Sequence, residues 1–266
     1  MGIIVRRLAS RNRMLAGLLM ACVLPSGFAQ STRPTAQPAL TTDQVVAQLV
    51  QHNRDRAAQL KHYEGCRYYA VNYVGFPSGR SAEMLVDMQF NAPAQKEFRI
   101  VKEHGSRLLL DHVLGELIQT EKEALDKDNL GHTDLTPENY QFRLVGTETI
   151  AGQQEYVLEV TPRFKSKFLY HGKIWVDASD FAVSRLSAQP AKNVSFWISH
   201  SEIQHEYKKV GDFWLPAHNT SVAHVRFGGT AKLTIDYRDY RIGPPRPGSN
   251  SDSCAQPGEV ELSQKQ

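Results

Sequence analysis

From Tyr140 onward the sequence alternates between apolar and polar residues for about a hundred positions, and this pattern restricts the fold more than any other feature. Alternation with a period of two is typical of antiparallel strands that bury one face. Breaks such as Ala151-Gly152 and Val210-Gly211-Asp212 mark hairpin turns. The pattern predicts strands at about residues 140–148, 153–161, 167–176, 181–188, 194–208, 213–224 and 231–242.

The preceding part of the chain combines two helices with further strands. Thr41 and Gln44 form a capping-box pattern at the start of a helix that ends near His62. A second helix begins near Ser106, because apolar residues then recur at helical spacing: Leu110, Val113, Leu114, Leu117 and Ile118. Between the helices the period changes to two from Glu64 onward, which predicts three strands: one with residues 69–73, one with residues 84–90 and one with residues 98–100.

Together these elements predict an α+β domain, mostly antiparallel β, over residues 41–242. We expect an incomplete, half-open curved β-barrel of about ten strands, with the two helices covering its concave face.

The first 29 residues have the features of a secretory signal peptide, with four arginines ahead of a short apolar run. Small residues favour cleavage after Ala29, which would release the chain into the periplasm. A lipid-anchored form at Cys22 is the alternative. Residues 30–40 then form a flexible leader, and residues 243–266 form a disordered tail.

Removal of the signal changes the charge balance and leaves two cysteines. Of the 31 basic residues four lie in the signal, so 27 remain against 28 acidic residues. This balance gives no reason to expect nucleic-acid binding. Export permits a disulfide between Cys66 and Cys254, and two free thiols are the alternative.

No motif of the sequence predicts catalysis. The histidines lack metal-ligand spacing, and no nucleophile elbow, phosphate-binding loop or dinucleotide glycine pattern is present. Asp177 and Asp180 are three residues apart, but they fall in a predicted hairpin turn, where we expect them to point into water. We therefore expect no catalytic residue, no metal site, no cofactor and no enzyme activity.

Large apolar side chains occupy the inward positions of the predicted strands. A curved sheet with such a concave face must be filled, either by its own helices or by a ligand. The candidate ligand-binding residues are Met84, Met88, Phe90, Phe98, Tyr156, Leu158, Phe168, Tyr170 and Ile174.

Three segments carry a resemblance to known proteins: residues 146–162 (GTETIAGQQEYVLEVTP), 172–186 (GKIWVDASDFAVSRL) and 207–218 (YKKVGDFWLPAH). Together with the order of elements, they resemble the lipoprotein-localisation (LolA/LolB) superfamily, which includes the sigma-factor regulator RseB. The resemblance covers residues 41–242. The similar proteins include bacterial proteins of the outer-membrane lipoprotein-sorting type.

That resemblance implies an incomplete barrel with a helical lid around an apolar cavity for lipid or acyl chains. The expected partner is then a lipid or an acylated protein, in outer-membrane lipid or lipoprotein trafficking. Transient membrane contact fits this role, and we expect a monomer. The alternative is an RseB-like sensor or interaction module, whose concave sheet binds another envelope protein.

Overall fold

The computed structural model describes residues 40–126, 129, 131–192, 198–226, 228–244 and 254. All of them belong to one unit, Leu40–Gln266. The expected signal peptide, Cys22 and most of the expected leader and tail lie outside the described residues.

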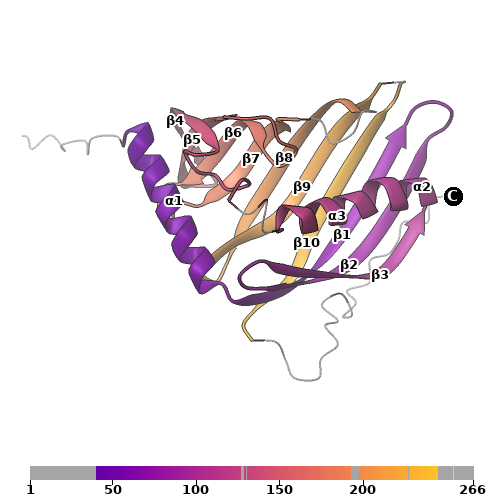
Figure 1. Ribbon diagram of the computed structural model, residues 1–266, viewed down its shortest axis with the longest axis horizontal. Helices are drawn as coiled ribbons and strands as arrows, with labels where there is room; N and C mark the ends of the chain where they lie inside the picture. The colour runs from indigo at the N-terminus through magenta and orange to yellow at the C-terminus, as the bar shows by residue number, and fades with distance from the viewer. Residues whose placement is uncertain are drawn as a thin grey trace, which may run out of the picture. The chain divides into compact units, whose positions relative to one another are not determined.

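The described residues form ten antiparallel strands in one open sheet, with the order β3-β2-β1-β10-β9-β8-β7-β6-β5-β4 (Figure 1). β1 pairs with β10, and this pairing joins the N-terminal strands β1–β3 to the C-terminal strands β4–β10. β3 and β4 are the edge strands of the sheet. The expected half-open, mostly antiparallel architecture is confirmed. The strands are β1 (His62–Val74), β2 (Arg80–Asn91), β3 (Gln95–Gly105), β4 (Tyr140–Ile150), β5 (Gln153–Pro162), β6 (Tyr170–Asp177), β7 (Val183–Pro190), β8 (Ile198–Val210), β9 (Phe213–Val225) and β10 (Thr230–Ile242).

The first helix, α1 (Thr42–Gln59), begins at the expected capping box. The Thr41 hydroxyl accepts a hydrogen bond from the Gln44 backbone N–H at 3.3 Å, and the Gln44 side chain accepts one from the Thr41 backbone N–H at 2.9 Å. These two bonds satisfy backbone donors that a helix start otherwise leaves free.

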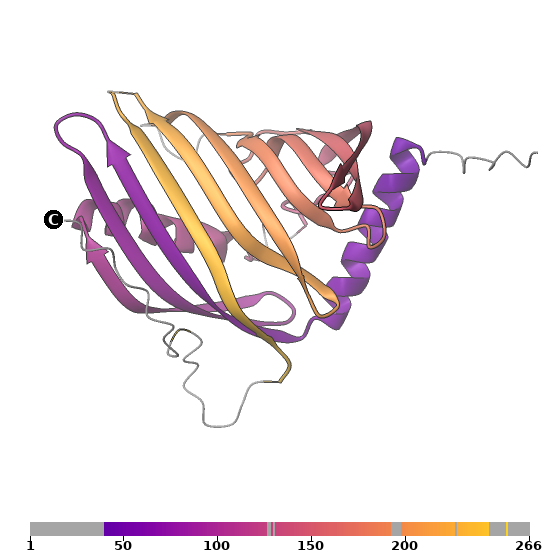
Figure 2. The ribbon, with the colours of Figure 1, turned by 180° about the vertical axis from the view of Figure 1, so that it is seen from behind.

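The second helical region contains a π-helical stretch that the sequence pattern did not predict. It runs through α2 (Arg107–Leu109), the π-helix η1 (Leu110–Gly115) and α3 (Glu116–Ala124). Figure 1 shows it in front of the β10, β1 and β2 part of the sheet, whereas α1 lies along the other end. In the view from behind, α2–α3 lies beyond the strands (Figure 2).

Two large apolar cores lie under these two helical regions. The first core joins α2–α3 to β1, β2 and β10, and its buried members are Tyr69, Val71, Ala82, Met84, Val86, Leu109, Leu110, Leu114, Ile118, Leu233, Ile235 and Tyr237. The second core joins α1 to β4–β7, and its buried members are Val45, Val46, Leu49, Tyr140, Leu158, Val160, Leu169, Ile174, Val176, Leu186 and Ala188. The apolar stripe expected on the second helix is thus confirmed, because Leu110, Leu114 and Ile118 are buried and Val113 and Leu117 pack beside them.

The turn between β6 and β7 contains the two aspartates that the sequence singles out. The hairpin is confirmed, but the expectation that both side chains point into water is wrong for Asp177, which is only 4% exposed. Its Oδ1 accepts hydrogen bonds from the backbone N–H groups of Ser179 and Asp180 at 2.9 and 2.8 Å, and from the Ser179 hydroxyl. The carboxylate therefore holds its own turn instead of facing solvent.

The structure joins Cys66 of β1 to Cys254 by a disulfide, with 5.1 Å between the Cα atoms. Cys66 opposes Asp87 of β2, and the backbone N–H of Cys254 donates to the Asp87 carboxylate at 2.7 Å. Because Val86, the preceding residue, packs against the second helical region, Asp87 and the disulfide lie on the opposite face of the sheet.

Candidate functional site: the concave face between two cores

The two cores share one face of the sheet, and β8 and β9 lie between them. Leu233 of the first core opposes Ser221, Ser221 opposes Ile203, and Ile203 opposes Ala188 of the second core. Residues that oppose each other in neighbouring strands point to the same face. A parallel row is formed by Ile235, Asn219, His205 and Leu186.

We call Ile203, His205, Asn219 and Ser221 the central strip. All four side chains are partly exposed, whereas Glu202, Gln204 and Glu206, which alternate with the β8 members, are exposed on the opposite face. No member of the central strip belongs to the buried part of either core. The strip is thus a mixed polar and apolar surface, bordered on both sides by packed apolar residues.

His205 provides the central strip with a neutral polar group. Its ring stacks on Tyr207, with 4.6 Å between the ring centroids, and lies 5.9 Å from the ring of Tyr237. Burial lowers the pKa of His205 to about 4, because it disfavours the imidazolium more than the nearby Glu121 favours it. The buried Nε2 atom has no hydrogen-bond partner among the described residues.

An ion cluster beside the strip links the second helical region to the sheet. Arg67 of β1 is only 2% exposed. Its guanidinium donates to both carboxylate oxygens of Glu121 on α3, at 2.6 and 3.1 Å, and Lys96 of β3 donates to Glu121 at 2.7 Å. The Arg67 guanidinium also lies over the rings of Phe98 and Tyr237, at 5.2 and 5.1 Å.

The electrostatics of this cluster follow from burial and pairing. Burial alone would raise the pKa of Glu121, but the charges of Arg67 and Lys96 hold it well below its usual range. Burial alone would lower the pKa of Arg67, but Glu121 raises it well above its usual value. Sequence reasoning missed this cluster. Arg67 nevertheless occupies an inward position in the alternation with Tyr69 and Val71, and a charge at such a position is a usable signal.

The structure distributes the candidate ligand-binding residues over several packed clusters. Met84 is 2% exposed in the first core, and Leu158 and Ile174 are fully buried in the second core, where Tyr156 packs against them. Met88 is buried in a third cluster with Tyr63 and Leu215, and Phe90 and Phe98 pack around it.

Phe168 and Tyr170 lie nearer the surface of the concave face. Both are partly exposed, and the Lys167 ammonium lies 5.1 Å from the ring of Phe168. Lys167 also pairs with Glu123 of α3. The nine residues therefore do not line one shared open cavity in this structure.

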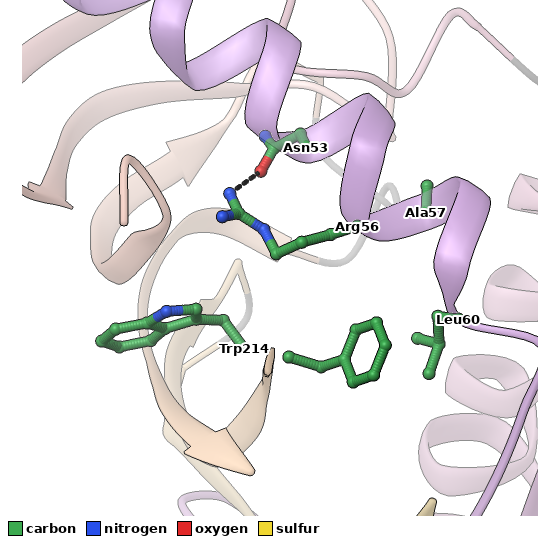
Figure 3. A pocket seen from close by; sticks show the side chains of 6 residues that line it. Asn53, Arg56, Ala57, Leu60 and Trp214 are labelled. Atoms are coloured by element: carbon green, nitrogen blue, oxygen red, sulfur yellow. Dashed lines mark hydrogen bonds between the residues drawn. The ribbon is translucent and has the colours of Figure 1, made fainter. Parts of the chain in front are cut away.

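A pocket of about 200 Å³ lies elsewhere, between α1 and the hairpin that joins β8 to β9 (Figure 3). It is lined by Asn53, Arg56, Ala57, Leu60, Phe213 and Trp214. Sequence reasoning missed this pocket, because its two walls are about 150 residues apart in the chain. A smaller pocket of about 120 Å³ is lined by Tyr68 of β1 and by residues of β2 and β3, among them Met84 of the candidate ligand-binding residues.

Two further findings concern the described residues. They contain no group of three or more His, Cys, Asp or Glu side chains placed to hold a metal ion. No helix among them combines the length and the apolar character that a membrane span requires.

Comparison with known proteins gives one partial family match. A model described as "Family of unknown function (DUF5686)" matches residues 134–240, which is less than half of the chain. No curated protein matches.

Similar solved structures include proteins of the group that the sequence resembles. A DUF1329 family protein from Desulfovibrio piger has 13% identity and a TM-score of 0.40, and the match covers 78% of this chain and 95% of that one. A LolA superfamily protein from Nitrosomonas europaea has 12% identity and a TM-score of 0.35, with 78% and 96% covered. A putative outer membrane lipoprotein-sorting protein domain from Vibrio parahaemolyticus has 14% identity and a TM-score of 0.36, with 76% and 94% covered.

Proposed function

We propose that this chain is a non-enzymatic protein of the cell envelope that binds a lipid, an acyl chain or another apolar ligand on its concave face. One observation carries the proposal. The central strip lies on the helix-covered face between two packed cores, yet its side chains remain partly exposed. A concave surface with apolar borders and a few convergent polar groups is the usual composition of a ligand site.

The chemistry of the strip favours an amphiphile over a plain hydrocarbon. Ile203 offers an apolar contact beside the packed Leu186 and Leu233, and the buried, unpartnered Nε2 of His205 offers a hydrogen bond to a ligand that displaces the groups covering it. A buried polar atom without a partner is costly, so a ligand that reaches it gains free energy. Outer-membrane lipid or lipoprotein trafficking is the process we propose for such a ligand.

The polar members of the strip favour a second candidate function. Asn219 and Ser221 oppose His205 and Ile203 and would be poor neighbours for an acyl chain. They suit a partner protein, whose backbone could hydrogen-bond to them. In this second candidate the chain is a sensor or interaction module of the envelope.

Binding of an environment-sensitive fatty-acid probe tests the first proposal. Ile203→Glu places a charge on the central strip, and we expect its dissociation constant to rise about tenfold or more, since an unpaired charge in an apolar contact costs several kcal/mol. Gln204→Glu is the matched control, because it adds the same charge to the next, exposed position on the opposite face. Circular dichroism establishes that both variants fold.

Two results would overturn the lipid proposal. One is the absence of saturable probe binding by the wild type, which would favour the partner-binding candidate. The other is equal weakening by both variants, which would show that the probe reports net charge instead of the strip.

The location we propose is the periplasm, with residues 1–29 as a signal peptide, 30–40 as a leader, 41–242 as the binding domain and 243–266 as a tail. Intact mass of the protein from its host tests this part. A mature chain that starts near Gln30 supports it, and a lipidated Cys22 would overturn it in favour of an anchored form.

A further inference from the structure

We propose that the pocket between α1 and the β8–β9 hairpin is a separate binding site for a carboxylate that carries one aromatic or branched apolar group. This site lies outside the central strip, so the inference does not depend on the function proposed above. Three features of the pocket support this site: the charge and hydrogen bonds of Arg56, the apolar and aromatic side chains that line the pocket, and its volume.

Arg56 is a partly buried cation that only neutral groups hold in place. Its Nη1 donates to the Asp180 carbonyl at 2.8 Å, and its Nη2 donates to the Asn53 side chain at 2.8 Å and to the Phe181 carbonyl at 2.9 Å. Among the described residues, no carboxylate lies within ion-pair distance of Arg56. A guanidinium has five N–H donors, so the Nε–H and one Nη1–H remain; they lie on different edges of the guanidinium, and a carboxylate therefore accepts from one of them.

The nearest acidic group is already occupied. The Asp180 carboxylate accepts a hydrogen bond from Trp214 Nε1 at 2.9 Å and pairs with Lys209 at 2.6 Å. Burial lowers the pKa of Arg56, and the charges of Asp180 and Asp55 oppose this effect, but an arginine stays protonated at neutral pH. The pocket therefore contains one positive charge whose orientation is fixed before any ligand arrives.

The rest of the lining is apolar or aromatic. Figure 3 shows Trp214 facing the Arg56 side chain across the pocket, with Ala57 on the same helix as Arg56 and Leu60 directly after the end of that helix. Phe213, next to Trp214 in the chain, completes the lining. Aromatic walls favour a flat ring or a branched apolar group, and the guanidinium favours a planar carboxylate.

The charges near the pocket and its volume restrict the class of ligand further. With Asp180 close to Arg56, a dianionic phosphate would meet repulsion, whereas a carboxylate carries a single charge. A volume of about 200 Å³ is smaller than a typical drug-sized site and larger than a cavity that accepts benzene. The ligand is therefore about the size of one aromatic amino acid, either a free aromatic acid or the C-terminal residue of a peptide.

The test uses N-acetyl-L-phenylalanine as probe and its uncharged amide as control. Binding is followed by NMR through the indole N–H signal of Trp214, assigned with Trp214→Phe, and the affinity is measured by calorimetry. We expect saturable binding of the acid and at least about tenfold weaker binding of the amide, because the amide loses the charged hydrogen bond to Arg56.

Two variants locate the site. Ala57→Phe should fill the pocket and weaken binding about tenfold or more without touching the bonds of Arg56. Ala58→Phe is the matched control, because Ala58 is an exposed neighbour on the same helix that does not line the pocket, and it should bind as the wild type does.

A tetrapeptide that ends in phenylalanine distinguishes the two sources of the ligand. Binding about tenfold tighter than the capped amino acid would assign the site to a polypeptide C-terminus, and equal binding would assign it to free aromatic acids. Three results would overturn the proposal: no saturable binding, equal binding of acid and amide, or wild-type affinity in a folded Ala57→Phe variant.

Discussion

The contact between Arg67 and Glu121 allows a sharp test of how the second helical region is held on the sheet. Glu121→Ala would leave the Arg67 guanidinium, whose side chain is only 3% exposed, without its carboxylate. Removing one partner of a buried ion pair costs about 3 to 5 kcal/mol, because the other charge stays buried and unpaired. Since the Glu121 side chain is itself 30% exposed, water can reach the vacated position, and we expect about 3 kcal/mol.

Glu123→Ala is the matched control for this change. Glu123 lies two residues further along α3 and pairs with Lys167, but both side chains are more than a third exposed. Exposed ion pairs contribute little to stability, so this variant should differ little from the wild type. The free energy of unfolding is measured by urea denaturation followed by circular dichroism, and the comparison is valid if the m-values agree.

A double replacement completes the test. Arg67→Met with Glu121→Leu removes both charges of the pair, and it should recover much of the stability lost in Glu121→Ala, because the most deeply buried charge, Arg67, is gone and only Lys96, whose side chain is 19% exposed, still lacks its partner. Equal destabilisation by Glu121→Ala and Glu123→Ala would refute the reasoning. So would a double variant that is less stable than Glu121→Ala.

Two other predictions concern the disulfide and His205. Cys254→Ser should lower the free energy of unfolding by about 2 to 5 kcal/mol, because the bridge spans 188 residues of the unfolded chain. A reductant should lower the stability of the wild type and leave that of the variant unchanged. Equal free energies of unfolding of the two proteins in urea would contradict this prediction. The pKa of His205 lies at about 4 instead of 6.5, so between these pH values the unfolded chain binds a proton that the folded chain does not. His205 thus opposes folding increasingly as the pH falls through this window, and at about 1.4 kcal/mol per pKa unit His205→Gln should reduce the acid loss of stability by up to about 3 kcal/mol. Parallel stability curves of the wild type and His205→Gln from pH 7 to pH 4 would contradict the assignment.

The strands and helices could be predicted from the sequence because local chemistry specifies them. Alternation from Tyr140 onward predicts β4 to β10 to within a few residues, and Thr41 with Gln44 predicts the start of α1. Each of these signals depends on neighbours within one turn or one hairpin. The π-helical η1 was not predicted, because its apolar spacing also fits an α-helix.

The burial of Asp177 was not predicted for a related reason. Turn residues are usually solvated, and the sequence does not show that Asp177 would accept three hydrogen bonds from its own turn. Contacts between residues that are distant in the chain are harder still to predict from the sequence. Arg67 and Glu121 are separated by 54 residues, and Arg56 lies far along the chain from Trp214, so neither pairing leaves a local pattern.

Alternation in the sequence did not predict which of the candidate ligand-binding residues are accessible to a ligand. A period of two assigns a side chain to one face of a strand, but it does not say which element covers that face. Met84 and Leu158 are both inward, as alternation requires, yet each is packed under a different helix and is inaccessible. The central strip on β8 and β9 is partly exposed, and neither of the two large cores includes a residue of these strands among its buried members. Accessible concave surface is therefore decided by where the two helices end across the sheet. For this reason Ile203, which is partly exposed at the border of the second core, is a better position than the buried Met84 at which to test ligand binding.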